Sequence, residues 1–426
     1  MPPATMLSSP ELAIVLEKSG ATSFTGGETI RGYVLRKSHF VDPDASVAVR
    51  LYGRAKVRIF VSRGMSHTTY RSRFNFFEDG DNAFKYQIHQ GPIHIPPDGS
   101  QDGKWPFAIT LPEHPRLASL RRENHNERTY LPLSNAASHG LPPTFDEKVH
   151  TPGLSVQLYV EYHLEATLLT SGKKSHRAVR PFGVRPTTSR SVVAAGETKR
   201  HSGPRRRIFS QRLVARPESD AKLSVGQRLK KILGSSELPC YTFSLQFDVA
   251  TTLQVGNPQP IPLRVQVTPE WNDTSEVLQT GTPPMILVKS FTLVLVSTTH
   301  YTSKALRSGG ERSGTSSLTL AKYNREIPKK LQRVDTAGLD APPSIDQLIV
   351  PQESAEQPLD LGIALGVRTS QPPIRIFPNF TTYNIKHEHH LKWELVLIVA
   401  GDSVKYEGKQ PITVLGPSPK STMAYA

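Results

Sequence analysis

The residues with the clearest capacity for metal chemistry form one short run, His387-Glu388-His389-His390. In an extended chain His387 and His389 point to the same side, so both imidazoles could face one ion. A zinc site needs three or four convergent ligands, often with cysteine, and the sequence supplies no evident further ligand. We therefore expect no metal site, and predict a polar turn before an apolar strand that begins at Leu391.

Catalytic chemistry has little support in the sequence. We find no Gly-x-Ser-x-Gly, phosphate-binding loop, dinucleotide fingerprint or His-Glu-x-x-His. The single cysteine, Cys240, has no activating neighbour in the sequence and is interpreted as structural. We expect a protein that is not an enzyme and that needs no cofactor.

Positive charge is concentrated in one segment. Residues 173–231 hold 17 lysines and arginines against three acids, which accounts for +14 of the net charge of +15. A short basic amphipathic helix is predicted over 223–233, because Val225, Leu229, Ile232 and Leu233 share one face. Three interpretations stay open: a solvated linker, a strand-edge tail neutralised by a partner, or a surface for anionic lipid headgroups or phosphate. The candidates for the third are Arg205, Arg206, Arg207, Arg212, Lys230 and Lys231.

Two further sets of residues could bind or carry phosphate. Ser210 follows three arginines in a pattern that basophilic kinases favour, and a phosphate there would add about −2 charge and weaken lipid binding. Arg50, Arg54, Lys56 and Arg58 lie on or beside one predicted strand and could attract acidic or phosphorylated tails. The alternatives are chance for Ser210 and an ordinary solvated strand face for the four cations.

The elements that must position these residues are strands. Residues 156–168 alternate strictly between apolar and polar side chains, which predicts a long strand with one buried face. A turn at Ser171-Gly172 and a returning strand at 178–184 follow. Similar patterns recur at 12–16, 29–35, 84–88, 105–111, 243–249, 263–267, 285–296 and 391–399. Such strands, with many Gly/Pro turns, predict an all-β protein built from β-sandwiches.

Three polar stretches interrupt this pattern, at 114–150, 187–236 and 303–357, and are predicted to be loops or linkers with one strand near 318–321. We predict a first sandwich over 1–186, a basic, partly disordered linker over 187–236, a second sandwich over 237–417 and a tail over 418–426. The N-terminus lacks a signal-peptide pattern, no apolar run reaches the ~20 residues of a membrane span, and one cysteine allows no internal disulfide. A cytoplasmic location is expected.

Several segments together resemble the arrestin family. Residues 27–34 (GETIRGYV), 105–112 (WPFAITLP) and 160–166 (VEYHLEA) are similar to strands of arrestin N-terminal domains, in the same order. Residues 380–385 (FTTYNI), the 391–399 strand and 411–414 (PITV) are similar to late strands of the C-terminal domain. The chain thus resembles an α-arrestin of fungal type, which implies two immunoglobulin-like sandwiches in tandem.

The resemblance also implies a function, that of a cytoplasmic adaptor, at times recruited to the plasma membrane or endosomes, that binds the tails of membrane proteins. Many such adaptors recruit HECT-type ubiquitin ligases through Pro-Pro-x-Tyr and promote ubiquitination and endocytosis of the cargo. The chain has no Pro-Pro-x-Tyr, but Leu238, Pro239 and Tyr241 fit a looser Leu-Pro-x-Tyr motif that a WW domain could dock. The alternative is that Tyr241 is packed at the start of a strand.

Two rival functions remain at this point. The basic segment could associate with nucleic acid, although Phe182 and Phe209 are its only aromatic residues and base stacking needs more. A non-catalytic carbohydrate-binding sandwich suits the fold but not the expected intracellular location.

Overall fold

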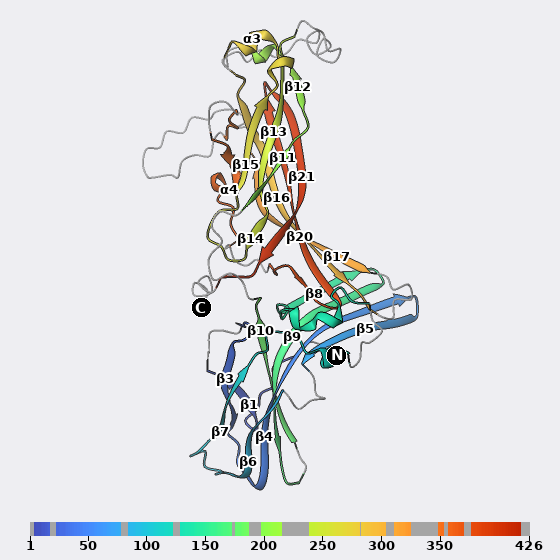
Figure 1. Ribbon diagram of the computed structural model, residues 1–426, viewed down its shortest axis with the longest axis vertical. Coiled ribbons are helices and arrows are strands. Elements are labelled where there is room, and N and C mark those ends of the chain that lie inside the picture. The colour runs from blue at the N-terminus through green and yellow to red at the C-terminus, as the bar shows by residue number, and fades with distance from the viewer. Residues whose placement is uncertain are drawn as a thin grey trace.

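The computed structural model describes residues 4–17, 23–77, 84–121, 128–172, 175–186, 197–214, 238–281, 283–303, 311–324, 348–352, 357–369 and 376–418. It is all-β and contains two sandwiches, which lie one beyond the other along the longest axis (Figure 1). Each has its own apolar core. The predicted fold class, two β-sandwiches in tandem, is therefore confirmed.

The first sandwich has a sheet of three strands facing a sheet of seven. The small sheet has the order β1-β3-β7, with bounds Ala13–Leu16, Thr29–Arg36 and Gly103–Thr110. The large sheet has the order β2-β10-β9-β4-β5, with bounds Ser23–Phe24, Ser175–Val184, Leu154–Leu169, Phe40–Arg63 and Ser66–Phe77. In addition, β6 (Lys85–Ile95) pairs with β4 and β8 (Phe145–Thr151) pairs with β9.

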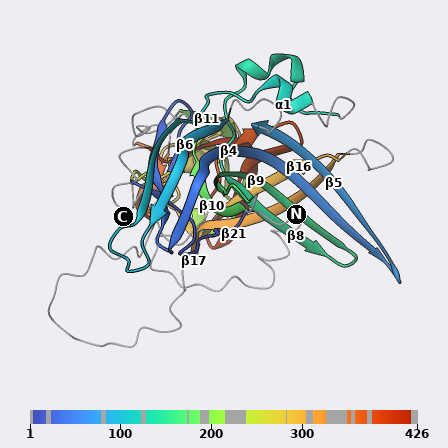
Figure 2. The ribbon, with the colours of Figure 1, turned by 90° about the horizontal axis from the view of Figure 1, so that it is seen from below.

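Strand β4 is 24 residues long and belongs to two regions of this sheet. Its first half lies between β6 and β9 in the sandwich. Its second half forms a hairpin with β5 that projects sideways (Figure 2), at the middle of the long axis (Figure 1). The strand predicted over 156–168 is β9, and its apolar face, with Val156, Leu158 and Val160, is fully buried. The prediction that the other face lies in water was wrong, because Tyr159, Glu161 and His163 are also buried. The returning strand predicted at 178–184 is β10.

The second sandwich has sheets of five and six strands. The first has the order β11 (Thr198–Ser202), β13 (Cys240–Ala250), β15 (Leu263–Pro269) and β18 (Leu359–Asp360). Strand β12 (Arg206–Phe209) also pairs with β13. The second has the order β14 (Thr252–Gln254), β21 (Asp402–Leu415), β20 (Ile385–Val399), β16 (Ile286–Tyr301) and β17 (Arg312–Asn324). Strand β19 (Phe380–Thr381) also pairs with β20.

The few helices are short and lie between strands. They are α1 (Leu117–Arg121), η1 (Leu133–Ser138), η2 (Gln211–Leu213), η3 (Trp271–Asp273), α3 (Glu276–Gln279) and α4 (Leu361–Ala364). The stretch predicted as a loop over 114–150 therefore holds α1, η1 and β8, while the strand predicted near 318–321 is part of β17.

Two sequence predictions about local structure were wrong. The linker predicted over 187–236 is shorter, because β11 and β12 pair antiparallel with β13 and so belong to the second sandwich. Residues 387–390 form no turn but lie inside β20, whose pairing with β16 extends to Ile385 and Tyr301. The helix predicted over 223–233 lies outside the described residues.

The two sandwiches meet through one face of β8 and β5 and the lower ends of β16 and β20 (Figure 1). The ring of Phe145 contacts those of Phe377 and Phe380, with centroids 4.7 and 5.0 Å apart. Phe74 stacks on Tyr383 at 5.4 Å. This aromatic layer continues the core of the first sandwich into the second.

Candidate functional site

The four cations predicted on one strand do share a face. Along β4, Val49, Leu51, Ala55, Val57 and Ile59 point into the core and are at most 1% exposed, so the alternate residues point outward. These outward residues are Arg50, Tyr52, Arg54, Lys56 and Arg58. The alternation that builds the core therefore also aligns the charges.

The hairpin adds two cations that the sequence prediction missed. Arg73 of β5 lies directly opposite Lys56, and Arg71 lies opposite Arg58. Directly paired residues point to the same face of a sheet. We name the resulting set Arg54, Lys56, Arg58, Arg71 and Arg73 the basic face. The register of the hairpin is the signal that could have revealed Arg71 and Arg73.

One carboxylate, that of Glu161 on β9, lies within this set and is 7% exposed. Arg54 donates a hydrogen bond to Glu161 Oε1, and Lys56 Nζ lies 3.5 Å from the same oxygen. The backbone N–H of Ala4 donates to Glu161 Oε2 at 2.5 Å. Glu161 is thus already engaged and neutralises only part of the charge around it.

The pKa of Lys56 shows that burial and the neighbouring cations disfavour its charged form. Burial, and next the neighbouring Arg54, lower the pKa of its amine to about 8, although Glu161 acts in the opposite direction. The Nζ atom of Lys56 and the Nε atom of Arg58 are buried without a hydrogen-bond acceptor in the described part of the chain. Both atoms are closed to solvent, so their charge can attract an anion to this surface although a ligand cannot contact them directly.

Arg50 lies beyond this set. It is opposite Glu165, which is bound by Arg177 with an Nε–Oε2 distance of 2.7 Å. Arg50 donates to the Tyr52 hydroxyl at 3.4 Å. The ring of Tyr52 stacks on His163, and burial lowers the pKa of that imidazole to about 4.

The N-terminal segment borders the same region. Leu7 and Val179 of β10 exchange two backbone hydrogen bonds of 2.9 Å. Between this segment and the sheet lies a pocket of about 380 Å³, lined among others by Tyr52, Arg54 and His163. Residues 4–7 therefore flank the basic face on the β10 side.

The predicted ligase motif is not on the surface. Tyr241 has no exposed area, Leu238 is 8% exposed, and the Tyr241 ring stacks on Phe243 in the second core. Pro239 directly precedes β13, and its carbonyl accepts a hydrogen bond from the backbone N–H of Ser210. The structure favours the packed alternative, because a WW domain needs an accessible Pro and Tyr.

Ser210 is also enclosed. It is 3% exposed and its hydroxyl accepts the backbone N–H of Arg212, which caps η2. A kinase could not reach this hydroxyl without opening the local structure, so the predicted phosphorylation is not supported.

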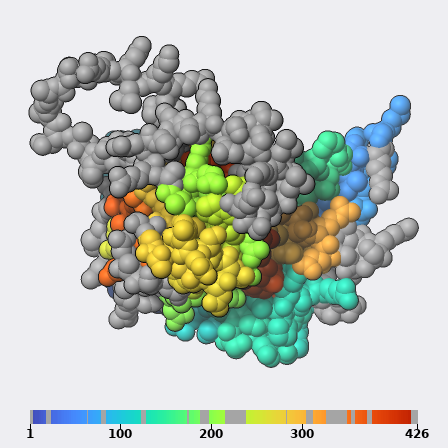
Figure 3. Space-filling view, turned by 90° about the horizontal axis from the view of Figure 1, so that it is seen from above, coloured from blue at the N-terminus to red at the C-terminus, as the bar shows by residue number. Residues whose placement is uncertain are grey.

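The arginines predicted to bind lipid lie at the far end of the second sandwich, close to η3. Arg205 and Arg207 both pair with Asp273, the latter at 3.3 Å. Arg206 stacks over the Tyr406 ring at 5.5 Å and donates to the Lys405 carbonyl. Figure 3 looks onto this end, where η3 and α3 gather in yellow. Much of the charge is therefore paired. Lys230 and Lys231 lie outside the described residues.

The histidine run is buried rather than solvated. His387 and His389 are 3% and 1% exposed, and burial lowers their pKa values to about 3 and about 4. In the described ranges no three metal-ligating side chains converge, here or elsewhere. Cys240 is buried and its thiol contacts Thr242 and the Asp273 carbonyl.

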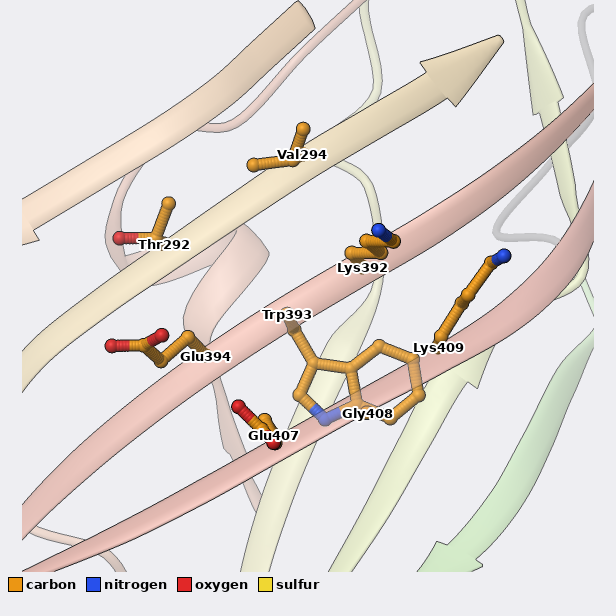
Figure 4. A pocket seen from close by; sticks show the side chains of 8 residues that line it. All are labelled: Thr292, Val294, Lys392, Trp393, Glu394, Glu407, Gly408 and Lys409. Carbon is orange, nitrogen blue, oxygen red and sulfur yellow. The ribbon is translucent and has the colours of Figure 1, made fainter. Parts of the chain in front are cut away.

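A second pocket, of about 580 Å³, lies on β16, β20 and β21. Lys392 and Lys409 lie toward one end, and Glu394 and Glu407 toward the other (Figure 4). The indole of Trp393 lies over Gly408, the position on β21 directly opposite. Its balanced charges give this pocket no preference for an anion or a cation.

Comparison of the chain with the models of known protein families gave no match, and comparison with curated proteins gave none either. Among the helices of the described residues, none is both long and apolar enough to cross a membrane. The basic face is therefore the feature on which a functional proposal has to rest.

Proposed function

We propose that this protein is an arrestin-like, non-enzymatic adaptor that binds the acidic or phosphorylated tails of membrane proteins on its basic face. It acts in the cytoplasm and is recruited to the plasma membrane or endosomes by its cargo. The resemblance stated above motivates this proposal, and the observation that carries it is the surplus of cations over carboxylates around Lys56.

The chemistry of the basic face suits an extended anionic ligand. Arg54, Lys56 and Arg58 follow one another on the same side of β4, about 7 Å apart along the strand. Arg71 and Arg73 form a second row of cations beside this one, on β5. Phosphate and carboxylate oxygens can accept bidentate hydrogen bonds from guanidinium groups, so a tail with several anionic side chains suits a face on which guanidinium groups outnumber carboxylates.

Promotion of cargo ubiquitination and endocytosis is part of the same proposal, because the resemblance implies it. Recruitment of a HECT-type ligase would have to use a surface other than Leu238–Tyr241, since that segment is buried. Nucleic acid is the less favoured ligand, because Arg200 of β11 pairs with Asp248, and Arg207 of β12 pairs with Asp273.

The test is a binding titration of a fluorescent peptide with several phosphoserines, beside its unphosphorylated form. The charge-reversal variant R58E/R71E should lower the affinity for the phosphopeptide at least tenfold, since each lost charge-assisted contact contributes more than 1 kcal/mol. The matched control is R31E, an exposed arginine on β3 of the other sheet. Equal affinities of R58E/R71E and the natural protein, or an equal loss in R31E, would contradict the proposal.

A further inference from the structure

Three histidines lie at or beside the contact between the two sandwiches; His387 and His389 are buried, and His139 is partly exposed. His387 and His389 lie side by side on β20, with ring centroids 4.6 Å apart, and belong to the second sandwich. His139 follows η1 in the first sandwich, and its Nδ1 lies 3.2 Å from the Tyr383 hydroxyl of the second. The surroundings of His139 and His387 include groups of the other sandwich, and His389 lies beside His387.

His387 is joined across the contact by a chain of hydrogen bonds. Its Nδ1 lies 2.8 Å from Thr299 Oγ1 on β16, and the Thr299 hydroxyl donates to Glu147 of β8 in the first sandwich. A hydroxyl has one proton, so while it donates to Glu147 it can only accept from His387. The neutral imidazole must then carry its proton on Nδ1.

The other nitrogen of His387 has no partner. Its Nε2 is buried without a hydrogen bond in the described part of the chain, and the ring packs against Phe145, Phe377 and Phe380. A second proton would have to go on Nε2 and would place a cation among these rings. The same holds for Nε2 of His389, whose Nδ1 is held by Asn379 at 2.8 Å.

We propose that His139, His387 and His389 form a proton-sensitive latch, which holds the two sandwiches together when the rings are neutral and loosens them when the rings are protonated. Separation exposes the imidazoles to water, where a cation is well solvated. The proposal concerns the contact between the sandwiches and does not depend on what the basic face binds.

The direction of the pH response follows from burial. Burial is the main cause that lowers the pKa of each ring, to about 3 for His387 and about 4 for His389, and the pKa of His139 is also lowered. An exposed imidazole has a pKa near 6.5, so the separated state binds more protons below that pH. His387 and His389 each shift the equilibrium toward separation about tenfold for every pH unit below 6.5, until the pH reaches their own lowered pKa values.

Other titratable groups face the latch and modify this response. Burial raises the pKa of Glu147, so its protonation stabilises the joined state and opposes the histidines, but it is one group against three. The neighbouring His114 and His390 lower the pKa values of His139 and His389 further, in the same direction as burial. Other charged groups lie on or beside β16 and β20, and they include His300, Glu311, Arg312, Lys386, Glu388, Lys392 and Lys409.

The experiment is fluorescence energy transfer in the full chain between dyes at M65C and V277C, with C240S in the background. Met65 is fully exposed between β4 and β5, and Val277 is 58% exposed in α3, so the dyes report on the two sandwiches. Transfer should change as the pH falls from 7.5 toward 4, with a midpoint between pH 6.5 and 4, and reverse on neutralisation.

The comparison variants are H387N/H389N and H139N, which keep a group near the Nδ1 position but do not titrate. Each should flatten the pH response, and the control H150N, an exposed histidine on β8, should keep it. The proposal is overturned if transfer in the otherwise natural chain is unchanged from pH 7.5 to 4. It is also overturned if H139N and the double variant respond like the control. If the double variant does not fold, H139N and the natural chain still decide the question.

Discussion

Replacing Lys56 by methionine should stabilise the protein and weaken its binding to anionic tails. The side chain of Lys56 is 9% exposed, and its amine lies among Arg54 and Arg73 with only Glu161 as a counter-charge. Methionine has a similar length and no charge, so K56M keeps the packing and removes the buried cation.

The magnitude follows from the pKa of Lys56, which falls from 10.5 to about 8 in the folded protein. That difference corresponds to about 3 kcal/mol against the charged amine. Water at the rim of the basic face screens part of it, so we expect K56M to raise the free energy of unfolding by about 1 to 2 kcal/mol at pH 7.

The sign of the pH dependence provides a second check. The unfolded amine keeps its proton up to about pH 10.5 and the folded amine only up to about pH 8, so the unfolded state binds more protons in between. The stability of the natural protein should therefore rise relative to that of K56M from pH 8 to 10.5. Other groups titrate in both proteins and cancel in the difference.

The assay is urea unfolding of both proteins at pH 7 and at intervals up to pH 10.5, beside a phosphopeptide titration at pH 7. The control K148M replaces an exposed lysine of β8 and should leave stability within about 0.5 kcal/mol. The reasoning is refuted if K56M lowers stability at pH 7, or if its difference from the natural protein does not depend on pH. Unchanged peptide affinity in K56M would instead remove Lys56 from the proposed binding surface.

Two further predictions concern the second sandwich. A Cβ at Gly408 would lie 2.2 Å from Trp393 Cζ2, so G408A should lower the free energy of unfolding by about 3 kcal/mol, and W393L in the G408A background should recover part of it in the same urea assay. A G408A protein as stable as the natural one would contradict this. Tyr241 is buried and its hydroxyl has no hydrogen-bond partner among the described residues, so Y241F should unfold at the same or a slightly higher urea concentration. Capture of the natural protein, but not of Y241F, by a WW domain would show instead that this segment can open.

The interior strands of the fold could be predicted from the sequence, because their signal is local. Strict alternation over 156–168 specifies which side of β9 faces the apolar core, and the same rule places Arg54, Lys56 and Arg58 together on β4. In both cases the period of two converts sequence spacing directly into side-chain direction. The two-sandwich class follows from the number and spacing of such strands.

The features that only the tertiary structure decided depend on contacts between segments that are distant in the sequence. The segment 198–209 has no apolar alternation and became part of a sheet only because β13 supplies its hydrogen-bonding partner. His387 and His389 look like polar residues of a solvated run, yet both are buried, and the Phe145 ring of the first sandwich packs against His387. Glu147 and Thr299 are 152 positions apart, and no local pattern encodes their contact. A polar side chain on a strand has the same spacing whether water or a second domain faces it, so only the packed structure shows which of them are buried.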